Sequence, residues 1–99
     1  MRNSINDTEE TTLIAEAGIT DKAELLVFND NHNTFDWVIK CFMEVCNHTF
    51  EQSEQLSLLV HFKGKAVVKA GTFENLKPLK NALIDRGLSA VIETYQEKA

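Results

Sequence analysis

The clearest periodic pattern in the chain lies at residues 35–46, FDWVIKCFMEVC. Its apolar side chains recur at spacings of 3, 4, 7, 8 and 11 residues, which is typical of one helix face. Asn33 or Thr34 can cap the start of this helix, and Asp36 lies in its first turn, where the helix dipole favours a negative charge. The stretch predicts a helix with a buried face formed by Phe35, Val38, Ile39, Phe42, Met43 and Cys46.

The flanking segments continue this pattern on both sides. Residues 24–28, ELLVF, are apolar and β-prone and predict a strand, and residues 29–33, NDNHN, are turn formers and predict a loop. After the helix, Thr49 and Gln52 have the spacing of a capping box, so a second helix is expected to run from there to Gly64. Its predicted apolar side consists of Leu56, Leu59, Val60 and Phe62.

The last third of the chain predicts strand, helix and strand. Residues 65–69 predict a strand, residues 70–72 a turn, and residues 89–94 a final strand. Between them, leucines at helical spacing predict a third helix ended by Gly87. Pro78 lacks a backbone N–H, so this helix either starts near residue 77 or has a distorted first turn.

The order of these elements predicts the fold class. Three short strands cannot bury both of their faces alone, so we expect a small three-stranded antiparallel sheet packed against three helices, β-α-α-β-α-β, in an α+β domain. The 99 residues suffice for one such domain. Residues 1–21 carry a net charge of −4 out of −5 and no aromatic residue, which predicts a disordered acidic tail before a core domain of residues 22–99.

Composition also argues against several classes of function. A net charge of −5 disfavours nucleic-acid binding, and no apolar stretch approaches a membrane span or a secretory signal. We therefore expect a cytoplasmic location with reduced thiols. Cys41 and Cys46 are five residues apart on one helix, beyond disulfide reach; Cys46 is expected in the core and Cys41 on another side.

Metal and catalytic signatures are weak. The only close pair of possible metal ligands is Cys46 and His48, whereas zinc needs four converging ligands, so no metal or other cofactor is expected. The sequence contains no nucleophile elbow, phosphate loop or HExxH spacing, so we expect a protein that is not an enzyme.

The loop at residues 29–33 and His61 together indicate a binding site that neither of them indicates alone. Alone, the loop is a turn that feeds a helix cap, and His61 is a histidine near a helix end. Together, amide and carboxylate oxygens near an imidazole can accept hydrogen bonds from an ammonium group, which offers three donors. Neighbouring apolar residues, Phe35, Val38 and Val60, are placed to line a pocket beside them.

At these residues the sequence resembles the ClpS adaptor family. Residues 27–39, VFNDNHNTFDWVI, resemble its Asn-Asp-Asp motif, and residues 58–65, LLVHFKGK, resemble its Val-His motif. Residues 71–74 and 88–93 match as well, so the resemblance covers roughly residues 24–94. It implies a bacterial, cytoplasmic adaptor that binds N-end rule N-degrons and hands the substrates to a Clp-type AAA+ unfoldase and its peptidase.

The resemblance implies a role for several positions. The substrate α-ammonium would be bound by Asn29, Asp30, Asn31 and His61. Its first side chain would enter a pocket formed by Val27, Phe28, Asn33, Phe35, Val38, Ser57, Val60 and Leu88. The N-terminal domain of the unfoldase would contact Glu74 and Lys80, and the acidic tail would be engaged during hand-over. An imidazole must be neutral to accept a hydrogen bond, so binding is expected to weaken on acidification.

Two departures from the family pattern affect these expectations. Asn31 stands where the family has a second Asp, which replaces a charged acceptor with a neutral one and predicts weaker binding. Ser57 stands where many relatives carry Met, which predicts a roomier pocket that accepts β-branched Ile or Val. The alternatives are a ClpS-like domain that docks on the unfoldase without binding N-degrons, and an interaction domain like that of the ribosomal stalk.

Overall fold

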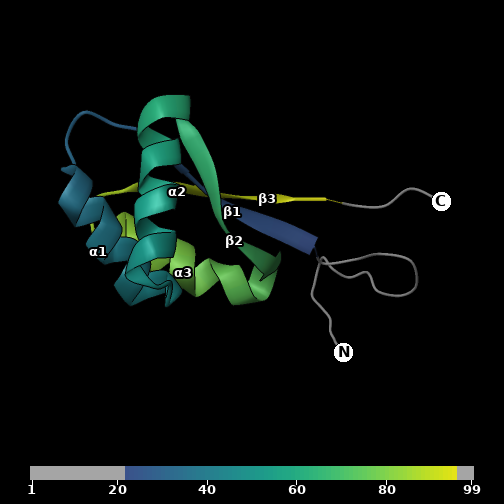
Figure 1. Ribbon diagram of the computed structural model, residues 1–99. Helices are drawn as coiled ribbons and strands as arrows, with labels where there is room; N and C mark the ends of the chain where they lie inside the picture. The colour runs from purple at the N-terminus through teal and green to yellow at the C-terminus, as the bar shows by residue number, and fades with distance from the viewer. Residues whose placement is uncertain (1–21, 96–99) are drawn as a thin grey trace, which may run out of the picture.

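The computed structural model describes residues 22–95 as a three-stranded sheet and three helices, in the predicted order (Figure 1). The elements are β1 (Lys22–Phe28), α1 (Phe35–Cys46), α2 (Phe50–Lys63), β2 (Lys65–Thr72), α3 (Phe73–Asp85) and β3 (Ser89–Thr94). The predicted α+β class is confirmed. The tail predicted at residues 1–21 lies outside the described residues. Within residues 22–95, no helix has the length and apolar character of a membrane span.

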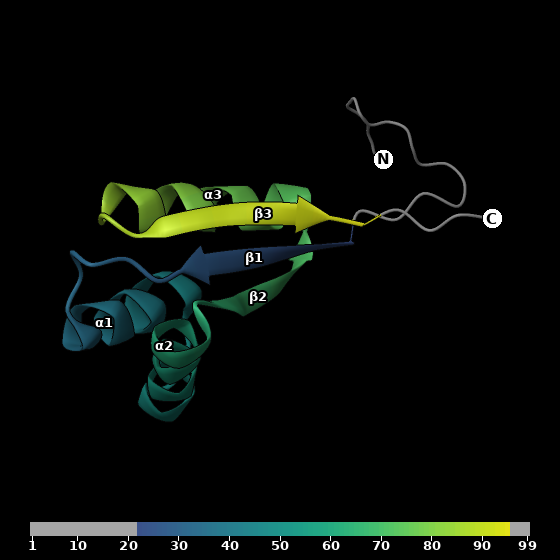
Figure 2. The ribbon, with the colours of Figure 1, turned by 90° about the horizontal axis from the view of Figure 1, so that it is seen from above.

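The sheet has the order β2-β1-β3, with both pairs antiparallel as predicted. Figures 1 and 2 show α3 running along the sheet next to β3, whereas α2 stands at the β2 edge beside α1. Val68 and Ala90 are buried, and their chain neighbours Val67 and Val91 are exposed. Because side chains alternate between the faces of a strand, the helices cover one face and leave the other open.

The core fills the space between the covered face of the sheet and the helices. Its largest fully buried side chains include Phe42, Leu25, Leu76, Leu83, Val27 and Val68. Burying a side chain the size of Phe42 stabilises the fold by about 1.5–3 kcal/mol. Cys41 belongs to this core too, at 0% exposure. The prediction that Cys41 faces another side is wrong, because α1 packs against both α2 and α3 and so is covered on more than one side.

Local capping explains where the first two helices begin and end. The Thr34 hydroxyl accepts from the Trp37 N–H at 3.1 Å, and Thr49 and Gln52 form the predicted capping box. Gly64 ends α2 with a φ of 91°, a left-handed conformation that costs glycine little. Phe35 and Met43, which the periodicity placed on the buried face of α1, are each 38% exposed and lie at its edge.

The strand β2 is longer than the sequence predicts. Residues 70–72 were expected to form a turn, but all three pair with β1: Gly71 lies opposite Ala23, and Thr72 opposite Lys22. The pairing partner, rather than local turn preference, determines the conformation here. Thr72 is both the last residue of β2 and the N-cap of α3, with its hydroxyl accepting from the Asn75 N–H at 3.1 Å.

The helix α3 begins at Phe73 and contains Pro78, so a start near residue 77 is wrong. The proline removes only the hydrogen bond to the carbonyl of Glu74, an exposed residue whose carbonyl can be hydrated instead. Burial of Leu76 and Leu83 against the sheet holds the helix on both sides of the proline.

The apolar side predicted for α2 is only partly correct. Leu59 is 44% exposed and Phe62 is 73% exposed, whereas Ser53, Ser57 and Val60 are buried. The helix turns its small residues inward because it packs closely against α1 and β2.

Candidate functional site

A single carboxylate organises the loop between β1 and α1. Asp30 accepts hydrogen bonds from the backbone N–H groups of His32 and Asn33, at 2.8 and 2.9 Å. It also accepts from the side-chain amide of Asn33 at 2.8 Å, and the same amide donates to the carbonyl of Gly87 at 2.8 Å. The loop is thereby tied to the turn between α3 and β3.

These hydrogen bonds keep the Asp30 carboxylate charged. Partial burial raises the pKa of Asp30, but hydrogen bonds from His32 and Asn33 outweigh it, and the net pKa is lowered. Both carboxylate oxygens are occupied by donors from the loop. The geometry therefore gives Asp30 a role in holding the loop in place, and because Asp30 also lines the pocket, its contact with an ammonium group stays a prediction.

Antiparallel pairing brings the two sequence motifs together. Phe28, the last residue of β1, pairs with Lys65 at the start of β2. Immediately beyond this pair, the Asn29 N–H donates to the carbonyl of Gly64 at 2.9 Å. The loop therefore leaves the sheet next to the last turn of α2, which carries His61.

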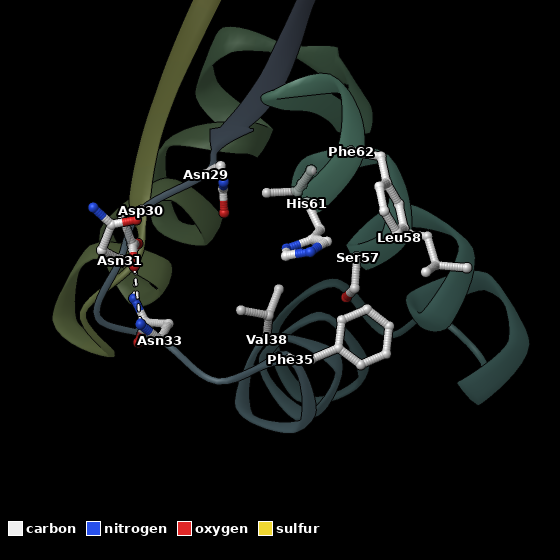
Figure 3. Close-up of a pocket in the computed structure, with 11 residues that line it drawn as sticks. Asn29, Asp30, Asn31, Asn33, Phe35, Val38, Ser57, Leu58, His61 and Phe62 are labelled. Carbon is white, nitrogen blue, oxygen red and sulfur yellow. Dashed lines mark hydrogen bonds between the residues drawn. The ribbon is translucent and has the colours of Figure 1, made fainter.

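A pocket of about 420 Å³ lies between this loop, α1 and α2. Figure 3 shows polar side chains on the loop side, and on the helix side apolar side chains together with Ser57 and His61. The residues lining the pocket are Asn29, Asp30, Asn31, Asn33, Phe35, Val38, Ser57, Leu58, Val60, His61 and Phe62. The volume is at the lower end of the range for small-molecule sites and suits one large side chain.

The polar side of the pocket carries acceptors that are not used within the protein. The side chains of Asn29, Asn31 and His61 form no hydrogen bond to another residue of the described chain. In Figure 3, Asn29 and His61 point toward each other across the pocket, whereas Asn31 lies beside Asp30 on the far side of the loop. The His61 ring packs edge-to-face against Phe62, with centroids 4.8 Å apart.

The thiols near this region lack the setting of a nucleophile. Cys41 and Cys46 are unpaired and buried, and burial raises the pKa of both, that of Cys46 to about 11. Neither borders the pocket. Among residues 22–95, no group of three or more His, Cys, Asp or Glu side chains is arranged to hold a metal ion.

The model of a protein family, "ATP-dependent Clp protease adaptor protein ClpS", matches residues 20–91 of the chain. The chain belongs to the ClpS family. This confirms the resemblance carried by the two motifs, and it does not fit the alternative of a stalk-like domain. The family is one of adaptors of the ATP-dependent Clp protease, which places the chain among protease adaptors.

Individual ClpS proteins are similar over most of the chain. The adapter protein ClpS of Thermosynechococcus vestitus is 33% identical over 67 residues, which cover 67% of this chain and 71% of that protein. ClpS of Mycobacterium tuberculosis is 31% identical over 80 residues, which cover 80% of this chain and 79% of that protein. Agrobacterium tumefaciens ClpS2 bound to L-phenylalaninamide has a similar fold, with a TM-score of 0.65, 16% identity, and coverage of 76% of this chain and 98% of that chain.

Three residues that the ClpS resemblance placed at the pocket do not line it. Val27 and Leu88 belong to the hydrophobic core, and Phe28 lies under the Lys65 ammonium group, 6.0 Å from its ring centre. Two lining residues, Leu58 and Phe62, were not predicted. Helical spacing could have predicted them as lining residues, because each directly follows a predicted site residue, Ser57 or His61, and the two lie one turn apart on α2.

The two residues proposed for the unfoldase contact of this ClpS-family chain lie on α3, away from the pocket. Glu74 is exposed and Lys80 is partly buried. They are six residues apart, which separates them by about 120° around the helix axis. They therefore do not share one face of α3.

Proposed function

We propose that this ClpS-family chain binds the N-terminal residue of N-degron substrates in the pocket of Figure 3 and delivers them to a Clp-type AAA+ unfoldase in the cytoplasm. The observation that carries the proposal is the juxtaposition of unpaired polar side chains, Asn29, Asn31 and His61, with an apolar chamber. The chamber is lined by Phe35, Val38 and Val60.

The polar side chains suit a free α-ammonium group. The amide oxygen of Asn29 and an imidazole nitrogen of His61, which accepts in the neutral ring, offer two acceptors to the three donors of an ammonium group. Asn31 lies farther away on the loop among the lining residues. An internal or acetylated residue lacks these donors and leaves the acceptors unpaired. Sites built for hydrogen bonding reject such analogues strongly.

The apolar chamber supplies the hydrophobic part of the affinity. Burying a Phe- or Leu-sized side chain there contributes about 2–3 kcal/mol. Asn31 is neutral and stands apart from His61, so the main negative charge near the ammonium group is that of Asp30. We therefore expect weaker binding than a carboxylate at position 31 would provide.

The test compares peptides that start with Phe and carry either a free or an acetylated N-terminus, by fluorescence anisotropy. The free peptide is expected to bind and the acetylated one not to bind. His61→Ala should abolish the difference. His32→Ala is the matched control, because His32 lies in the same loop but does not line the pocket. Equal affinity of the two peptides would contradict the proposal.

Delivery is tested separately from binding. We propose that Glu74 and Lys80 contact the N-terminal domain of the unfoldase, and that the acidic residues 1–21 act in hand-over. Charge reversal at Glu74 should weaken capture of a Clp unfoldase without changing peptide affinity, because α3 does not line the pocket. Unfoldase capture without peptide binding would instead support an adaptor that has lost N-degron recognition.

A further inference from the structure

Two apolar side chains at the edge of the pocket have no role in the proposed binding of the first residue. Leu58 and Phe62 on α2 both line the pocket. In Figure 3 they lie next to each other, on the side of His61 away from the loop of residues 29–33. Phe62 is 73% exposed, more than any other large apolar side chain in the described part of the chain. The two side chains form an apolar shelf that continues outward from the pocket.

The position of the shelf distinguishes it from other exposed apolar side chains of α2. Single apolar side chains are common on protein surfaces and need no function. Leu59 is an example, because it is 44% exposed on the same helix but does not line the pocket. Leu58 and Phe62 are four residues apart, so they share a helix face, and both border the pocket. The shelf is therefore accessible surface beside the site and not merely the outer face of the helix.

The size of the pocket determines which part of a substrate meets the shelf. A pocket of about 420 Å³ suits one large side chain, so the second residue of a bound N-terminus lies outside the apolar chamber. The His61 ring, which accepts from the α-ammonium group in the proposed function, has its centre 4.8 Å from that of the Phe62 ring. Consecutive Cα atoms of a peptide are about 3.8 Å apart. The side chain of the second residue is therefore within reach of the shelf.

From this geometry we infer that the shelf of Leu58 and Phe62 is a subsite for the second residue of the substrate and favours an apolar side chain there. The inference rests on the proposed function. Neither side chain carries a polar group, so burial of apolar surface is the interaction that the shelf offers, and it is favourable in proportion to the area covered. Leucine at the second position covers more of the shelf than alanine does, and it should bind more tightly.

The experiment measures, by fluorescence anisotropy, the affinities of two peptides that start with a free Phe and differ only in Leu or Ala at the second position. We expect the unmodified chain to prefer the Leu peptide by about fivefold, since a shelf that is open on one side provides about half the gain of full burial. Leu58→Ala and Phe62→Ala should each lower this ratio, and the double variant should bring it to about one. Leu59→Ala is the matched control and should leave the ratio unchanged.

The ratio of the two affinities is the readout because Phe62→Ala also removes the ring contact of His61, which affects both peptides alike. A ratio that neither shelf variant alters would overturn the inference.

A second measurement uses only the unmodified chain, so it does not depend on the folding of a variant. A peptide isomer with Ala at the second position and Leu at the fifth has the same composition as the Leu peptide, and it should bind about fivefold more weakly. Equal binding of the two isomers would overturn the inference and leave the proposed function intact. If the free and acetylated forms of the Leu peptide bind equally, the proposed function fails and this inference fails with it.

Discussion

Replacing Asp30 with Asn tests whether this carboxylate holds the binding loop. The exchange keeps the shape of the side chain, but removes its charge and turns one oxygen into an NH₂ group. That group would face the Asn33 amide, a donor 2.8 Å away, so one hydrogen bond is lost. The bonds from the N–H groups of His32 and Asn33 remain, but with a neutral acceptor.

The size of the effect follows from these three contacts. Hydrogen bonds to a charged group contribute about 1.5–3 kcal/mol, and neutral ones about half as much. For fully buried groups, losing one of these bonds and halving two would cost about 3–6 kcal/mol; because Asp30 is only partly buried, water replaces much of what is lost, and we expect a total of about 1–2 kcal/mol. The loop conformation that Asp30 holds places Asn29 and Asn31 at the pocket. Since only molecules with this loop conformation bind the peptide, the dissociation constant rises by the factor by which their fraction falls. We expect a severalfold increase, with an upper limit of about thirtyfold.

The assay is fluorescence anisotropy with a Phe-initiated peptide, accompanied by thermal unfolding. Asp36→Asn is the matched control, because it removes the same charge from the first turn of α1 without altering the loop contacts. A dissociation constant for Asp30→Asn within twofold of the unmodified chain would refute the argument. An equal loss in Asp36→Asn would show that net charge, and not the loop contacts, sets the affinity.

Four further outcomes are expected. Asn31→Asp should tighten binding of a Phe-initiated peptide, because a charged acceptor is about twice as strong as a neutral one; an unchanged dissociation constant speaks against a role for this position. Ile-initiated peptides should bind nearly as well as Leu-initiated ones because Ser57 is small, and strong rejection of Ile in the anisotropy assay would exclude this. Because its hydrogen bonds lower the pKa of Asp30, the stability that this carboxylate contributes should be fully present above its unfolded pKa and be lost as the pH falls through the lowered folded value; the same pH dependence of thermal unfolding in Asp30→Asn and in the unmodified chain would contradict this. Phe62→Ala should weaken peptide binding severalfold, because it removes the edge-to-face partner of His61; titration calorimetry that finds no change would argue that this contact does not orient the imidazole.

Features that depend on neighbours within about one helical turn were predictable from the sequence. The periodicity of residues 35–46, the capping box at Thr49, and the left-handed Gly64 define the first two helices, because each acts over three or four residues. The same holds for the chemistry of the site, since the loop amides and His61 are evident as residue types before any fold is known. Their convergence was expected from the family motifs, and the pairing of β1 with β2 places them together.

Features that depend on distant partners were decided only by the tertiary structure. Residues 70–72 are extended because β1 lies beside them, and Cys41 is buried because two other helices cover α1. Asp30 accepts hydrogen bonds from its own loop while it borders the pocket, and Val27 and Leu88 pack into the hydrophobic core instead of lining the pocket. The unpartnered hydroxyl of Ser57 belongs to this group as well, since a sequence shows which polar atoms exist but not which of them folding leaves without a hydrogen-bond partner.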